Sequence, residues 1–148
     1  MMTRQGASAG CICNQRPDWA RIEDDEVMRW PAIDIAEWEE LRECPNCGAS
    51  WLAAWPEESE SQPILCRPQP ITARKLRDLD HPATMRPYCL ARLAEHLGEI
   101  KERKTTCCKV KCNRKRLAGS TYCIEHLIAE RFGRHLARLG NPDDTLNR

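Results

Sequence analysis

The chain has 148 residues, with 30% charged and 41% apolar side chains, which makes it too polar for a membrane protein and too apolar for a disordered one. It contains ten cysteines but only eight aromatic residues, so a large aromatic core is excluded. No stretch reaches the about 18 uninterrupted apolar residues of a membrane span, and the first 30 residues contain no signal-peptide core. We therefore expect a cytoplasmic protein with no membrane partner.

The net charge of +1 hides two oppositely charged halves. Residues 1–60 carry 5 Lys/Arg and 13 Asp/Glu, a net charge of −8, whereas residues 61–148 carry 18 and 9, a net charge of +9. The densest basic stretch, residues 101–116, has eight Lys/Arg against Glu102 alone. The two halves either attract each other within the molecule or face different partners.

The N-terminal half divides into three parts. Residues 1–10 are small and polar and are expected to form a flexible tail, followed by an acidic, Trp-rich module over residues 11–55. All five tryptophans lie in this module, and we expect most of them to fill a small core, although one or two exposed indoles would suit a protein interface. Residues 56–70 contain four prolines and are expected to form a connector.

Within the acidic module, Ile35, Trp38 and Leu41 recur at a spacing of three, which predicts a short helix over residues 34–42, with a strand as the alternative. Residues 51–55 are expected to form an apolar strand or a turn of helix. Inside the connector, residues 64–66 are expected to be extended.

Three helices are predicted in the C-terminal part, residues 71–148. The first begins at a capping Thr72 and is stopped by His81-Pro82. The second covers about residues 87–102, and the third about residues 121–139, each with one apolar face. Together these elements predict a small α+β protein that is mostly helical, stabilised by zinc, with two longer helices in its C-terminal half.

The cysteine spacings favour metal binding over disulfides, because nothing directs the chain to an oxidising compartment. Neighbouring donors two to four residues apart can bind one ion, and zinc takes four nitrogen or sulfur ligands in a tetrahedron. We expect two zinc ions as the cofactors, each held by a closed set of four ligands.

The C-terminal set pairs Cys108 and Cys112 with Cys123 and His126, which a helix start places one turn apart. Cys107 is the alternative to Cys108. A cysteine knuckle, a hairpin and two ligands from a helix N-terminus resemble a treble-clef zinc finger, and the resemblance covers residues 107–139. The same Tyr-Cys-x-x-His ending occurs in small zinc elements beside bacterial and phage nuclease domains.

The N-terminal set comprises Cys11, Cys13, Cys44 and Cys47, whose two pairs about 30 residues apart are typical of a zinc-ribbon-like site. Cys66 is an alternative to Cys11 or Cys13. Cys66, Cys89 and the unused member of the 107/108 pair are expected to be packed thiols, with a third metal site built from them as the alternative.

The sequence predicts no catalytic residues. Both expected metal sites have four protein ligands, whereas a catalytic zinc keeps one position open. The chain lacks the zinc-protease and zinc-deaminase motifs, a Gly-rich phosphate loop and a nucleophile elbow. His81, His96 and His135 are interpreted as surface or core polar contacts. We therefore expect no enzyme activity and no small-molecule substrate.

Two binding functions fit the charge pattern. The first is an adaptor whose acidic half contacts a protein partner and whose basic stretch, residues 101–116, contacts nucleic acid. Its candidate contacts are Lys109, Lys111, Arg114, Lys115 and Arg116. The second is an inhibitor that blocks a toxin or a nuclease and binds no nucleic acid itself. Its basis is that residues 11–55 loosely resemble small bacterial immunity-type proteins.

Overall fold

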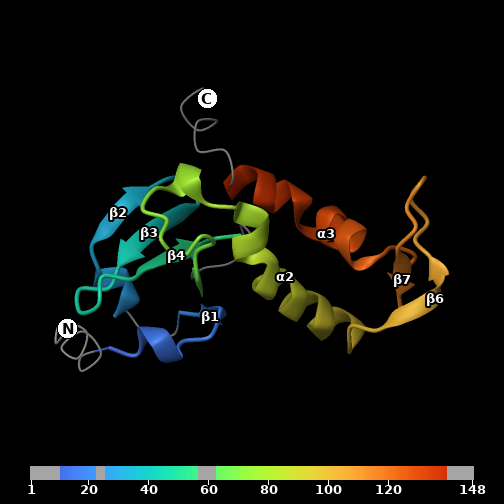
Figure 1. Ribbon diagram of the computed structural model, residues 1–148, viewed down its shortest axis with the longest axis horizontal. Helices are drawn as coiled ribbons and strands as arrows, with labels where there is room; N and C mark the ends of the chain where they lie inside the picture. The colour runs from blue at the N-terminus through green and yellow to red at the C-terminus, as the bar shows by residue number, and fades with distance from the viewer. Residues whose placement is uncertain (1–10, 23–25, 57–62, 140–148) are drawn as a thin grey trace.

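Five antiparallel strands form the larger of two sheets in the computed structural model, which describes residues 11–22, 26–56 and 63–139 (Figure 1). The strand order across this sheet is β1-β5-β4-β3-β2. The strands are β1 (Trp19–Arg21), β2 (Ala32–Ile35), β3 (Glu39–Glu43), β4 (Ser50–Ala54) and β5 (Ile64–Cys66). Short 3₁₀ turns lie at Cys13–Gln15 (η1), Val27–Arg29 (η2) and Leu76–Asp78 (η3).

The central strand β4 is buried along its whole length, because both faces of the sheet are covered. Leu52 and Ala54 belong to the apolar cluster that includes the two long helices. Trp51 and Ala53 point to the other cluster, which the N-terminal segment builds around Cys13 and Cys44. Because successive side chains of a strand point to opposite faces of the sheet, one face of β4 packs on the helices and the other on the cluster around Cys13 and Cys44.

The two long helices, α2 (His81–Leu97) and α3 (Ile124–Leu139), pack against the first of these faces. Tyr88 on α2 makes edge-to-face contacts with Trp19 of β1 at 5.3 Å and with Phe132 of α3 at 6.2 Å between ring centroids. One apolar cluster thus joins the sheet to both helices. No helix in the described ranges is long and apolar enough to cross a bilayer.

The smaller sheet is a hairpin of β6 (Glu102–Thr106) and β7 (Lys115–Leu117). It lies at the far end of α2 and α3 from the five-stranded sheet (Figure 1). Every residue of β6 is exposed, and only Leu117 of β7 is buried, so the hairpin contributes little to the main core.

The predicted helix over residues 34–42 is wrong, because this segment forms β2, a turn and β3. Leu41 pairs with Leu52 of β4, and the amide of Ala36 donates to the carbonyl oxygen of Glu39 at 2.8 Å to close the turn. Pairing with a fully buried strand thus overrides a short pattern that suits either structure. Of the strand and the turn of helix expected over residues 51–55, the structure has the strand, β4, and the extended piece expected at residues 64–66 is confirmed as β5.

The predicted boundaries of the first two C-terminal helices also differ from the structure. Only the 3₁₀ turn η3 lies in the first segment, and α2 begins at His81 rather than at Pro87. Asp80 caps α2 by accepting a hydrogen bond from the amide of Ala83 at 3.0 Å. Pro82 therefore occupies the first helical turn, where a missing N–H costs nothing, instead of stopping a helix. With seven strands and two long helices in the described residues, the fold is more sheet-rich than the expected mostly helical one.

Candidate metal centres

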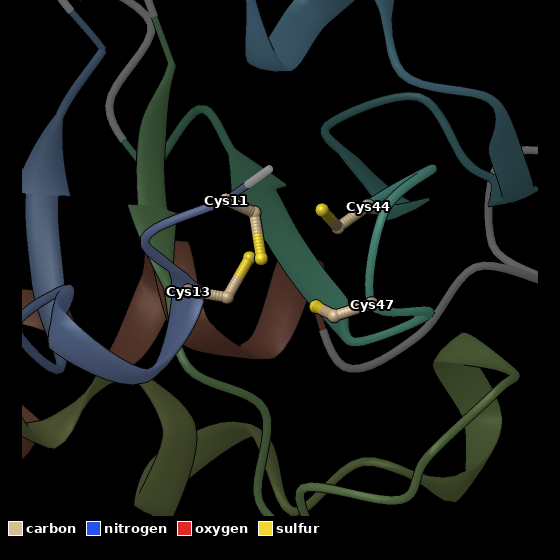
Figure 2. A group of neighbouring side chains, drawn as sticks. All are labelled: Cys11, Cys13, Cys44 and Cys47. Carbon is tan, nitrogen blue, oxygen red and sulfur yellow. The ribbon is translucent and has the colours of Figure 1, made fainter. Parts of the chain in front are cut away.

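Four cysteines from two segments far apart in the sequence form the N-terminal centre, on the face of the larger sheet opposite the two long helices (Figure 2). Cys13 begins η1 and Cys11 lies two residues before it, whereas Cys44 and Cys47 lie on the turn between β3 and β4. Their sulfur atoms all lie within 4.8 Å of one another. This is the grouping that the spacings predicted, and it is able to hold a metal ion.

The turn between β3 and β4 is shaped to aim backbone N–H groups at sulfur. The amide of Gly48 donates to the carbonyl oxygen of Cys44 at 2.9 Å, and Gly48 has a φ of 79°, which favours glycine. In this turn the amides of Cys47 and Asn46 donate to the Cys44 sulfur, and the amide of Ala49 donates to the Cys47 sulfur. Donors placed in this way stabilise thiolates, the form in which cysteine binds metal.

The thiols of this centre differ in how readily they lose a proton. Burial, together with hydrogen bonds that the Cys13 thiol makes to the Cys44 and Cys47 sulfurs, raises the pKa of Cys13 to about 12. Burial also raises the pKa of Cys44, but the backbone amides outweigh that effect, so its pKa lies below the ordinary thiol value. A metal ion at this place would displace the remaining protons, so its binding is coupled to pH.

The C-terminal centre combines three cysteines with one histidine. The Nδ1 atom of His126 lies 3.4 Å from the Cys107 sulfur and 3.2 Å from the Cys123 sulfur. The sulfur atoms of Cys112 and Cys123 are 3.9 Å apart. A tetrahedral ion with metal–sulfur bonds of about 2.3 Å separates two sulfurs by about 3.8 Å, so this geometry suits one ion.

Cys107, and not the expected Cys108, belongs to this centre. Cys108 is exposed, and its sulfur is directed to Thr121 Oγ1 at 3.6 Å. Burial raises the pKa of Cys107, but N–H donation from Lys109 and Cys123, together with His126 and Cys112, lowers it to about 6. The loop between Cys107 and Cys112 is one residue longer than expected, and Lys111 turns it with a φ of 65°.

We expected Cys108, which leaves three residues before Cys112, and kept Cys107, which leaves four, as the alternative. The deciding signal is the hairpin register. The amide of Cys107 donates to the carbonyl oxygen of Arg114 at 2.8 Å, immediately after β6 pairs with β7. Successive residues of extended chain point to opposite sides, so that register turns Cys107 inward and Cys108 outward.

The remaining thiols are dispersed. All ten cysteines lie in the described residues, and none forms a disulfide. Cys66 and Cys89 are buried in the apolar cluster on the helix side of the sheet, and the Cys66 sulfur lies 3.9 Å from the Met85 sulfur. Cys66 is therefore on the opposite face from the N-terminal centre. Cys108 is exposed and lies apart from Cys66 and Cys89, so these three thiols do not form the third metal site that was the alternative.

The basic candidate residues have unequal environments. Lys111 and Lys115 are exposed, and the Lys109 ammonium lies 5.4 Å from the ring centroid of Tyr122. Arg114 is exposed and lies 3.9 Å from Glu125. Arg116 is half-buried and donates to the carbonyl oxygen of Ser120 and to the Thr105 hydroxyl, so its first role is to hold the hairpin.

Comparisons of the chain with protein-family models, with curated proteins and with solved structures found no match. The two donor groups thus stand on their own geometry, and they define a small α+β protein with two candidate metal centres.

Proposed function

We propose that this protein is a non-enzymatic, zinc-stabilised binding protein whose β6–β7 hairpin contacts the phosphate backbone of nucleic acid. The observation that carries the proposal is the exposed, weakly neutralised charge of residues 101–116. Zinc is the ion that best suits four sulfur donors in one group and three sulfurs with an imidazole in the other. The treble-clef resemblance of residues 107–139 supports the same choice.

Seven of the eight basic residues between 101 and 116 are exposed, and Arg116 is the half-buried exception. In the described part of the chain, the only ion pair of this stretch is the one between Arg114 and Glu125, whose nitrogen and oxygen atoms are 3.9 Å apart. The metal centre lies between the hairpin and the start of α3, so these side chains can contact a polyanion without touching the ligands. Such a surface binds phosphates chiefly through charge and releases counterions.

The acidic half is partly neutralised inside the molecule. Among the described residues, two ion pairs and one carboxylate–imidazole contact link it to the basic half, and none of them involves the stretch 101–116. They are Asp18–Arg67 at 3.3 Å, Glu43–Arg74 at 3.1 Å and Glu39–His81 at 2.9 Å.

The tryptophans of the acidic half are likewise used internally. Trp30 and Trp51 are buried, and Trp19, Trp38 and Trp55 are partly buried, so none of the five is fully exposed. A protein partner for this half, either in an adaptor or in an inhibitor, remains a second proposal that these contacts do not strengthen.

Binding to a labelled duplex at several salt concentrations tests the proposed nucleic-acid contact. Changing Lys104, Lys109 and Lys115 together to Gln should weaken binding at low salt. The slope of log affinity against log salt should shrink by about 2–3 units, at about 0.9 per lost phosphate contact.

The matched control changes three exposed basic residues outside the hairpin, namely Arg29, Lys75 and Arg77, to Gln. It should leave the salt slope of the wild type unchanged. A wild type that binds neither duplex DNA nor RNA at low salt, or equal losses in the two triple variants, would contradict the proposal.

A further inference from the structure

The indole of Trp51 lies on β4 beside the N-terminal metal centre. Trp51 is 1% exposed and belongs to the same buried cluster as Cys13 and Cys44. Its Nε1 atom is buried, and it makes no hydrogen bond among the described residues. Buried indole N–H groups almost always have a partner, so this atom needs one.

The Cys13 sulfur is the acceptor that the structure offers. The side chain of Trp51 lies within hydrogen-bonding reach of the Cys13 thiol, so a metal-bound thiolate at Cys13 would give the indole N–H an acceptor. A donor favours the charged thiolate, which is the state that a metal requires. Cys44 and Cys47 obtain such donors from the backbone of their own turn.

Arg67, the residue directly after β5, contacts both Trp51 and the segment that carries Cys13. Its guanidinium lies over the Trp51 ring, 4.5 Å from the centroid. The same group donates to the carbonyl oxygen of Arg16 at 2.6 Å and to that of Cys13 at 3.4 Å. One side chain therefore contacts both the indole and the backbone of the segment that carries Cys13.

We propose that Trp51 is a positioning residue of the N-terminal metal centre, whose indole N–H donates a hydrogen bond to Cys13 Sγ while Arg67 holds both groups in place. The inference rests on the proposed zinc binding. Four thiolates around a divalent ion carry a net charge of −2, and N–H donors disperse that charge. Outer-sphere hydrogen bonds of this kind change metal affinity by about 10–100-fold.

The first test compares Trp51→Phe with Trp30→Phe. Trp30 is 5% exposed in the same cluster and lies under Arg16, so both variants shrink a buried ring, but only one removes the proposed donor. Zinc transfer from the folded chain to a competing chelator should become 10–100-fold more favourable for one of the two ions in Trp51→Phe. Trp30→Phe should retain the wild-type affinities. Equal behaviour of the two variants would overturn the assignment.

A second measurement needs no variant. In protein loaded with ¹¹³Cd, the Trp51 indole proton should show scalar coupling to the metal through the Cys13 sulfur, alongside the backbone amides of Cys47 and Ala49. Coupling at the amides but not at the indole would overturn the role of Trp51 and leave the metal centre standing. Failure of this centre to take up any metal would instead refute the proposed zinc binding, and the role of Trp51 with it.

Discussion

Cys107 and Cys108 are neighbours in sequence with opposite environments, and this contrast gives a residue-scale prediction. Cys107→Ser should remove one zinc ion per chain and destabilise the finger, because a structural zinc supplies much of the folding energy of such a module. Cys108→Ser should retain both ions and the stability of the wild type, since an exposed substitution changes stability by at most about 0.5 kcal/mol. Elemental analysis and thermal unfolding measure both effects, and the reverse order would restore Cys108 as the ligand.

The buried pair of Glu39 and His81 gives a second prediction. Nε2 of His81 lies 2.9 Å from both carboxylate oxygens of Glu39, which is 1% exposed. Burial raises the pKa of Glu39 above its ordinary 4.5, His81 opposes this rise, and Asp34 adds to it. The folded protein therefore binds this proton more tightly than the unfolded chain. The resulting stabilisation is complete below pH 4.5 and is lost as the pH rises through the folded-state pKa.

Denaturation of the wild type and of Glu39→Gln at several pH values measures this effect. The difference in unfolding free energy should shift in favour of the wild type as the pH falls from about 7 toward the ordinary carboxyl value. Both proteins keep the same candidate metal ligands, so the acid sensitivity of the two metal centres cancels in the difference. A difference that is constant with pH, or that moves the other way, would contradict the raised pKa.

At the scale of elements, the capping contact of Asp80 should decide where α2 begins. Asp80→Ala removes the acceptor of the Ala83 amide and should cost about 0.5–2 kcal/mol of stability. Asp80→Asn keeps a capping oxygen and should lose much less. Chemical denaturation with zinc in excess compares the two, and equal losses would show that the cap contributes nothing.

The same elements show how far the sequence alone predicts the fold. The period of α3, the extended residues 64–66 and the four-cysteine group follow from local spacing, and the structure agrees with them. A strand around Leu41 was predicted only as the alternative to a helix, because the pairing with Leu52 on β4 that stabilises it does not show in the spacing. His81-Pro82 was predicted to end a helix but begins one instead. The dipeptide is compatible with both positions, and the preceding Asp80, which caps α2, makes it a helix start.

For the whole molecule, the separation of the β6–β7 hairpin from the main core predicts that damage to the C-terminal centre stays local. Cys123→Ser should abolish amide-exchange protection in β6, β7 and the Cys107–Cys112 loop. Strands β3, β4 and β5 should stay protected, because they belong to a core that the hairpin hardly contributes to. Exchange measured by mass spectrometry distinguishes this from a global loss, which would show that the C-terminal centre supports the entire fold.

The placement of the hairpin at the far end of two helices has a further consequence (Figure 1). The hairpin depends on its own metal centre and lies far from the core that keeps the chain folded. Loss of that ion can therefore unfold the hairpin while the rest of the chain stays folded. If the hairpin is the nucleic-acid contact, the amount of bound nucleic acid should follow the zinc supply around the protein, while the amount of folded protein should not. The same chain would then work as a reporter of available zinc as well as a binder.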